Sequence, residues 1–154
     1  AAALSVMDGA GTPAGAGALR SLLASVGARD YVALLVWLTS EPALDDAVTR
    51  IRAMITRATG AATTAGTGPR YLHSTGQYHK GGPDTGVFIV ITGDDATATG
   101  VPGTTYTFAT LKRAQALGDL RALSAHGRRV VRLHVAGDGN PGPLLEDAFA
   151  DALR

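Results

Sequence analysis

Two uninterrupted apolar runs constrain the fold of this chain more than any other feature. Residues 31–38 read Tyr-Val-Ala-Leu-Leu-Val-Trp-Leu, and residues 86–92 read Gly-Val-Phe-Ile-Val-Ile-Thr. Neither run alternates apolar with polar side chains, and the second is rich in β-branched residues, which favour strands. Strands of this kind are covered on both faces inside a parallel sheet. The pattern therefore predicts a sheet with helices packed on each side.

Segments with helical periodicity surround these strands. Large apolar residues recur at helical spacing within 19–26, 42–59 and 143–153, and a longer helix is predicted over 106–126. The leucines of the longer helix drift around its axis. This drift predicts either burial on more than one side or a kink near Gly118.

Two further strands complete the pattern. Residues 61–65 form a short candidate strand, and residues 129–135 alternate enough to be placed near a sheet edge. Strands that alternate with helices pair in parallel through right-handed crossovers. The predicted fold is therefore α/β, a three-layer α/β/α sandwich around a mostly parallel sheet.

Length and composition fit one domain. The chain has 154 residues, of which 45% are hydrophobic and 18% charged, a balance typical of a folded globular protein. Residues 1–13 are interpreted as a linker or terminal segment, and residues 14–154 as a single domain. Because the chain begins without methionine, we expect it to be a domain cut from a longer protein.

Charge and residue usage exclude several functional classes. The net charge is +1 and the basic residues are scattered, so nucleic acid is not an expected partner. The absence of cysteine excludes a disulfide scaffold, a thiolate metal site and a cysteine nucleophile. The longest apolar run, 31–38, is too short to span a bilayer, and no signal peptide is recognisable. We expect a soluble, cytoplasmic protein without a membrane partner.

Polar and ionisable side chains are dense between residues 68 and 86, just after a predicted strand end. Ligands of parallel α/β sheets bind beyond the carboxyl ends of the strands, so a site is expected here. His73 and His79 bring imidazoles suited to proton transfer near neutral pH. Arg70 and Lys80 suit an anionic substrate. This composition indicates a phosphorylated small molecule.

The spacing within this segment suggests how its side chains are arranged. If residues 71–79 are helical, His73 and Gln77 are i, i+4 neighbours that reach one ligand from the same face. His79 then points elsewhere.

Structural roles are the alternative for several ionisable residues. The histidines of the 68–86 segment could be ordinary loop residues satisfied by backbone carbonyls, and Lys80 could be a solvated surface charge. His126 and His134 are interpreted as structural. The acidic pair Asp94-Asp95 is interpreted as a solvated turn, and no metal is expected.

The sequence from Gly68 to Phe88 resembles a known family. It reads Gly-Pro-Arg-Tyr-Leu-His-Ser-Thr-Gly-Gln-Tyr-His-Lys-Gly-Gly-Pro-Asp-Thr-Gly-Val-Phe. Nearly the same string occurs near the end of bifunctional transaldolase/phosphoglucose isomerase proteins. The resemblance covers most of residues 30–134, and a string this long and irregular is a specific signal.

The resemblance implies both a fold and a reaction. It implies a flavodoxin-like sugar isomerase (SIS) domain, the second of two lobes that together interconvert glucose 6-phosphate and fructose 6-phosphate through an enediol. No metal or organic cofactor takes part. The first lobe grips the phosphate and the second brings much of the acid-base machinery. The implied partners are a sugar phosphate, a preceding SIS lobe and transaldolase domain of the same chain, and a second subunit of a homodimer.

The same resemblance implies roles for individual residues. The implied catalytic residues are His73, Gln77 and His79, and the implied substrate-binding residues are Arg70, Ser74, Thr75, Lys80 and Gly81. Ordinary members carry a Gly-Glu-Pro-Gly-Thr-Asn-Gly-Gln motif whose glutamate is the base, whereas residues 66–71 contain no carboxylate. The general base is therefore not assigned, and the ring-opening lysine is expected upstream rather than at Lys80 or Lys112.

Three hypotheses remain open. This lobe could supply catalytic residues to an isomerase, it could be a non-catalytic sugar phosphate-binding module that regulates an attached enzyme, or it could be a structural dimerisation lobe. The missing glutamate favours the second. We expect the chain alone to bind sugar phosphate weakly without isomerising it.

Overall fold

The computed structural model describes residues 2–95 and 99–154. Its five strands form one sheet in the order β1-β5-β4-β2-β3. The strands are β1 (Ala3–Asp8), β2 (Tyr31–Val36), β3 (Ala62–Thr67), β4 (Gly86–Gly93) and β5 (Arg129–Ala136). β2, β3, β4 and β5 are parallel, whereas β1 pairs antiparallel with β5 at the edge.

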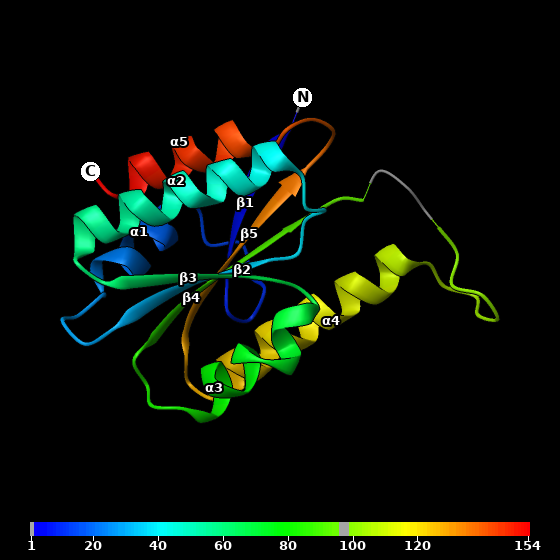
Figure 1. Cartoon of the computed structure of the whole chain (residues 1–154), viewed down its shortest axis with the longest axis horizontal. Helices are drawn as coiled ribbons and strands as arrows, with labels where there is room; N and C mark the ends of the chain where they lie inside the picture. The colour runs from blue at the N-terminus through cyan, green and yellow to red at the C-terminus, as the bar shows by residue number, and fades with distance from the viewer. Residues whose placement is uncertain (1, 96–98) are drawn as a thin grey trace.

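Helices cover both faces of this sheet (Figure 1). One layer contains α1 (Gly17–Ala24), α2 (Pro42–Thr59) and α5 (Gly142–Ala152). The other contains the 3₁₀ turn η1 (Arg70–His73), α3 (Thr75–Gly81) and α4 (Phe108–Ala125). We call these the α2 layer and the α4 layer. The three-layer α/β/α sandwich with a mostly parallel sheet is thus confirmed.

The central strands supply both halves of the core. Successive side chains of a strand point to opposite faces of the sheet. In β4, Val87, Ile89 and Ile91 therefore pack toward the α2 layer, while Phe88 and Val90 pack toward the α4 layer. All five side chains are buried, as the two apolar runs predicted.

The strand order fixes where a ligand would bind. The parallel strands follow the order β3-β2-β4-β5, which is the flavodoxin-like order with its reversal between β2 and β4. In such sheets the crevice beyond the carboxyl ends of the strands at the reversal is the usual binding position. That position lies beyond Val36 in β2 and Gly93 in β4.

The interpretation of residues 1–13 as a linker is wrong for residues 3–8, which form the edge strand β1. The reason is a short alternation: Leu4 and Val6 pack against the α2-layer core, whereas Ala3 and Ser5 are exposed. This alternation is only one strand long and is followed by a glycine-rich turn, so the sequence alone does not reveal it.

Burial of α4 on more than one side is also wrong. Its buried residues, Ala116, Asp119, Leu120 and Leu123, lie on one face, and the helix runs unbroken through Gly118. Leu111 is exposed because it belongs to the first turns of α4, which extend away from the rest of the α4 layer (Figure 1). The drift of the leucines reflects this extension of the helix.

Candidate functional site

The segment predicted to carry the site follows β3 and lies in the α4 layer. It is divided in two: η1 ends at His73 and α3 begins at Thr75, with Ser74 between them outside helical geometry (φ −132°, ψ −96°). The backbone N–H of Ser74 donates to the carbonyl of Tyr71, which closes the 3₁₀ turn. His73 and Gln77 are therefore not on one continuous helix, contrary to the expectation from their spacing.

His79 lies in the core, unlike the exposed His73 and Gln77. Only 4% of its surface is exposed, and its Nδ1 lies 2.9 Å from the hydroxyl of Tyr31. Burial lowers the pKa of His79, with nearby Lys80 acting in the same direction and Asp119 opposing it. Because Tyr31 and Gly86 begin β2 and β4, His79 lies near the amino ends of the strands. This is the edge opposite the usual ligand position.

Lys80 is tied to the helix α4. Its Nζ lies 2.6 Å from Oδ1 of Asp119, and the hydroxyl of Tyr71 donates to Oδ2 of the same carboxylate at 2.7 Å. The indole N–H of Trp37 donates in turn to the Tyr71 hydroxyl at 3.0 Å. We call Trp37, Tyr71, Lys80 and Asp119 the clamp, because they join η1 and α3 to α4 and to the end of β2.

The other predicted site residues are exposed on the α4 layer. They are Arg70, His73, Ser74, Thr75, Gln77 and Gly81. They line none of the cavities at the carboxyl ends of the strands. The structure therefore separates the predicted set into His79, which is buried, Lys80, which is half-buried, and an exposed remainder.

A cavity of about 160 Å³ lies at the predicted ligand position, between the strand ends and the first turns of α4. Trp37 forms its wall on the β2 side, and β4 contributes Thr92 and the residues that follow it. Its ionisable residues are Asp94, Asp95, Lys112, Arg113, Arg132 and His134. We call this the switch-point cavity.

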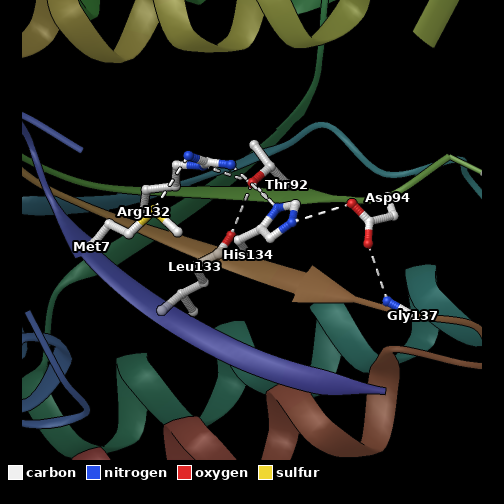
Figure 2. Close-up of polar contacts among 7 residues, drawn as sticks. All are labelled: Met7, Thr92, Asp94, Arg132, Leu133, His134 and Gly137. Atoms are coloured by element: carbon white, nitrogen blue, oxygen red, sulfur yellow. Dashed lines mark hydrogen bonds and ion pairs between the residues drawn. The ribbon is translucent and has the colours of Figure 1, made fainter. Parts of the chain in front are cut away.

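Arg132 is the most deeply buried charge of this cavity, with 7% of its surface exposed (Figure 2). Its Nε donates to the Thr92 hydroxyl at 2.9 Å, and its Nη2 donates to Nδ1 of His134 at 3.2 Å. Its Nη1 lies 3.3 Å from the sulfur of Met7 in β1. Burial, together with nearby Arg113, lowers the pKa of Arg132.

His134 forms a pair with Asp94, which follows the end of β4 (Figure 2). A guanidinium can only donate, so Nδ1 of His134 accepts from Arg132 and the ring proton lies on Nε2. That nitrogen is 3.4 Å from Oδ1 of Asp94, whose Oδ2 accepts from the backbone N–H of Gly137. Burial lowers the pKa of His134, as do Arg132 and Arg113, whereas Asp94 opposes them. The imidazole is therefore neutral near pH 7.

Asp95 and Lys112 form an ion pair across the mouth of the cavity. The adjacent Arg113 reaches the cavity from the same helix, α4. Asp94 and Asp95 are thus not a simple solvated turn, because Asp94 contacts His134 and Asp95 pairs with Lys112. Within residues 2–95 and 99–154, no group of three or more metal-ligating side chains occurs.

Arg132 and His134, the polar residues of β5 that line the cavity, are not among the functional residues predicted from the sequence. A signal for them exists in the sequence. Arg132 and His134 alternate with Val131, Leu133 and Val135, so they share one face of the strand. That alternation also fits an edge strand facing solvent, but β5 is covered by β1 and its polar side chains line the cavity.

Comparison with known proteins supports the fold alone. No protein-family profile and no curated protein matches the sequence. The fold is similar to that of a hypothetical protein from Thermus thermophilus, with a TM-score of 0.70, 17% sequence identity and 87% of this chain covered. The chain spans 37% of the length of that protein. Within the described residues, no helix has both the length and the apolar character needed to cross a membrane.

Proposed function

We propose that this domain is one lobe of an aldose-ketose isomerase that acts on a phosphorylated sugar, with glucose 6-phosphate as the substrate implied by the family resemblance. One observation carries the proposal. The switch-point cavity places the His134–Asp94 pair beside the cationic side chains of Lys112, Arg113 and Arg132. Cations suit a phosphorylated substrate, and a carboxylate with an oriented imidazole suits proton transfer.

Asp94 is the carboxylate best placed to act as the base that residues 66–71 do not supply. Its two oxygens are oriented by His134 and by the N–H of Gly137, while Asp95 is occupied by Lys112. Neutral His134 would polarise Asp94 and hold it in place. An enediol mechanism moves one proton between adjacent carbons, and an oriented carboxylate can accept and return it.

The size of the cavity fits a shared site. A volume of about 160 Å³ is smaller than the roughly 300–1,000 Å³ of cavities that enclose a drug-sized ligand. This lobe would therefore contact part of the sugar phosphate, and a preceding lobe or a second subunit would contact the rest.

A second candidate function is a non-catalytic sugar phosphate-binding module. The burial of His79, which the resemblance made catalytic, favours it, as do the exposed positions of His73 and Gln77 outside the cavity. In this case the cavity would bind ligand without proton transfer.

The test is a coupled assay for conversion of glucose 6-phosphate, performed on the whole protein that carries this domain. Asp94→Asn and His134→Gln should each lower turnover by about 10²-fold or more. Asp138→Asn, an exposed acid in the loop after β5, is the matched control and should retain normal rates.

The outcomes separate the two candidate functions. Normal turnover in both cavity variants would exclude the assigned proton-transfer pair. If the wild type does not convert glucose 6-phosphate, and both variants still bind it, the domain is a binding module. Parallel variants His73→Ala and Gln77→Ala test whether the exposed residues act in a completed site.

A further inference from the structure

We propose that Arg132 anchors an oxyanion subsite in the switch-point cavity, and that the ligand group it holds is a phosphate monoester. The proposal deepens the proposed function, because it names the atoms that would hold the charged group of the substrate. It also stands apart from turnover, since anion binding requires no reaction. The family resemblance implies that the other lobe grips the phosphate, so assigning the phosphate to this cavity departs from what the resemblance implies.

The first reason is an uncompensated buried charge. Arg132 is almost fully buried, yet among residues 2–95 and 99–154 no carboxylate pairs with it. Its guanidinium donates to a hydroxyl, an imidazole nitrogen and a thioether, all neutral. A buried cation without a counter-charge is costly and is usually paired in proteins. An anionic ligand would supply the missing counter-charge.

The second reason is the pattern of available donors. A guanidinium has five N–H donors, and the three recorded contacts leave two without an acceptor among the described residues. Arginine binds phosphate oxygens through such pairs of donors. The guanidinium lines the cavity, whose volume of about 160 Å³ is large enough for a phosphate group.

The third reason is the charge of the surrounding residues. Arg113 faces the same cavity from α4 and is close enough to lower the pKa of Arg132, so two cations lie near each other. Both are unpaired with acids in the described part of the chain. Repulsion between two cations is relieved when an anion lies between them. The two acidic residues that line the cavity contact other side chains: Asp95 pairs with Lys112 and Asp94 with His134.

A purely structural role for Arg132 makes a different prediction. Arg132 contacts β4 through Thr92 and β1 through Met7, so it could serve to join the strands. In that case its replacement by methionine would destabilise the fold whether or not an anion is present. If the residue is instead an anion anchor, Arg132→Met removes an uncompensated buried charge. Folding without ligand would then be unaffected or improved.

The experiment measures how inorganic phosphate, and separately glucose 6-phosphate, changes the thermal unfolding temperature of the chain at constant ionic strength set with sodium chloride. Phosphate should raise the unfolding temperature of the wild type. Arg132→Met should weaken phosphate binding by about tenfold or more, because a charge-assisted hydrogen-bond pair is lost. Arg57→Met makes the same charge change on α2, on the opposite face of the sheet, and should bind phosphate normally.

Equal protection of wild type and Arg132→Met by phosphate would overturn the proposal, as would no protection of the wild type at any concentration. If Arg132→Met does not fold, the exposed Arg113→Met variant is decisive: unchanged phosphate binding refutes the subsite and weakened binding supports it. The proposed function fails separately. An anion site that survives alongside normal turnover in Asp94→Asn would refute the proton-transfer pair alone.

Discussion

At the scale of single residues, two histidines connect folding to pH. Burial lowers the pKa of both His79 and His134 in the folded protein. An unfolded chain has histidines with pKa near 6.5, so below that value it binds more protons than the native state. The stability that the two neutral histidines contribute should therefore be fully present above about pH 6.5. It should be lost as the pH falls below the pKa of histidine in the unfolded chain.

His79→Phe tests this coupling. Phenylalanine keeps the ring packing against Tyr31 and Phe88 but cannot be protonated. The groups facing His79, namely Tyr31, Lys80 and Asp119, remain in place. Urea midpoints at pH 7.5 and pH 5.5 should differ less in this variant than in the wild type, whereas exposed His73→Gln should show the wild-type difference. An unchanged difference in His79→Phe would mean that another group carries the pH dependence.

The limits of sequence interpretation are also clearest at single residues. Lys80 and His79 are residue types that often occur in binding sites. Their partners, Asp119 and Tyr31, are distant in sequence. Whether a histidine is buried or exposed depends on such partners, so the string from residue 68 to 86 could not separate core residues from surface residues. Arg132 was not predicted for the same reason. What marks it as a functional candidate is that no carboxylate of the described residues lies close enough to pair with it, and this depends on the three-dimensional structure.

At the scale of elements, the clamp holds the two helical pieces of the α4 layer together. Asp119 is buried and accepts hydrogen bonds from Tyr71 and Lys80, and Tyr71 reaches Trp37, which lines the switch-point cavity. Burial and the neighbouring Asp119 both raise the pKa of Tyr71, so its hydroxyl stays protonated and can donate. The clamp therefore connects packing in the α4 layer to the wall of the cavity.

Asp119→Ala should lower the free energy of unfolding by about 3 kcal/mol, because it leaves the ammonium of Lys80 and the hydroxyl of Tyr71 without their acceptor. Replacing both charges, Lys80→Met with Asp119→Leu, should cost much less than Asp119→Ala, since no unpaired charge remains. Asp151→Ala, which removes an exposed ion pair, should change little. Urea denaturation measures all three variants. Equal losses in Asp119→Ala and the double variant would show that packing, not charge pairing, stabilises the clamp.

Elements were predicted well where the sequence pattern is long and poorly where it is short. The apolar runs at 31–38 and 86–92 and the stripe of Leu44, Val48, Ile51 and Ile55 became β2, β4 and the buried face of α2. Each of these patterns extends over most of its strand or helix. The η1–α3 boundary at Ser74 and the strand β1 are set by tertiary contacts, through Tyr71 in one case and β5 in the other.

At the scale of the whole molecule, the first and last parts of the chain close the sheet together. β1 pairs with β5 over its full length, from Ala3 opposite Ala136 to Asp8 opposite Val131. It covers what would otherwise be an open edge of the parallel sheet, and such edges promote association between molecules. It also brings Met7 against Arg132, so the N-terminal strand forms part of the surroundings of the switch-point cavity.

A matched pair of substitutions in β1 tests this arrangement. Val6 packs against the α2-layer core, whereas Ala3 is exposed and lies opposite Ala136 on β5. Val6→Asp should lower the free energy of unfolding by about 1–3 kcal/mol because it places a charge against apolar side chains. Ala3→Asp adds the same charge at the exposed start of the strand and should change stability by less than about 0.5 kcal/mol.

Urea denaturation, with light scattering to detect association, measures both variants. If residues 1–13 were a linker, both substitutions would be silent. If β1 closes the sheet, only Val6→Asp loses stability, and the exposed edge of β5 makes that variant prone to associate. Such a loss should also weaken phosphate protection in proportion to the fraction of molecules in which β1 is detached, because Arg132 would then lose Met7 and gain access to water. Phosphate binding at Arg132 therefore depends on the pairing of β1 with β5.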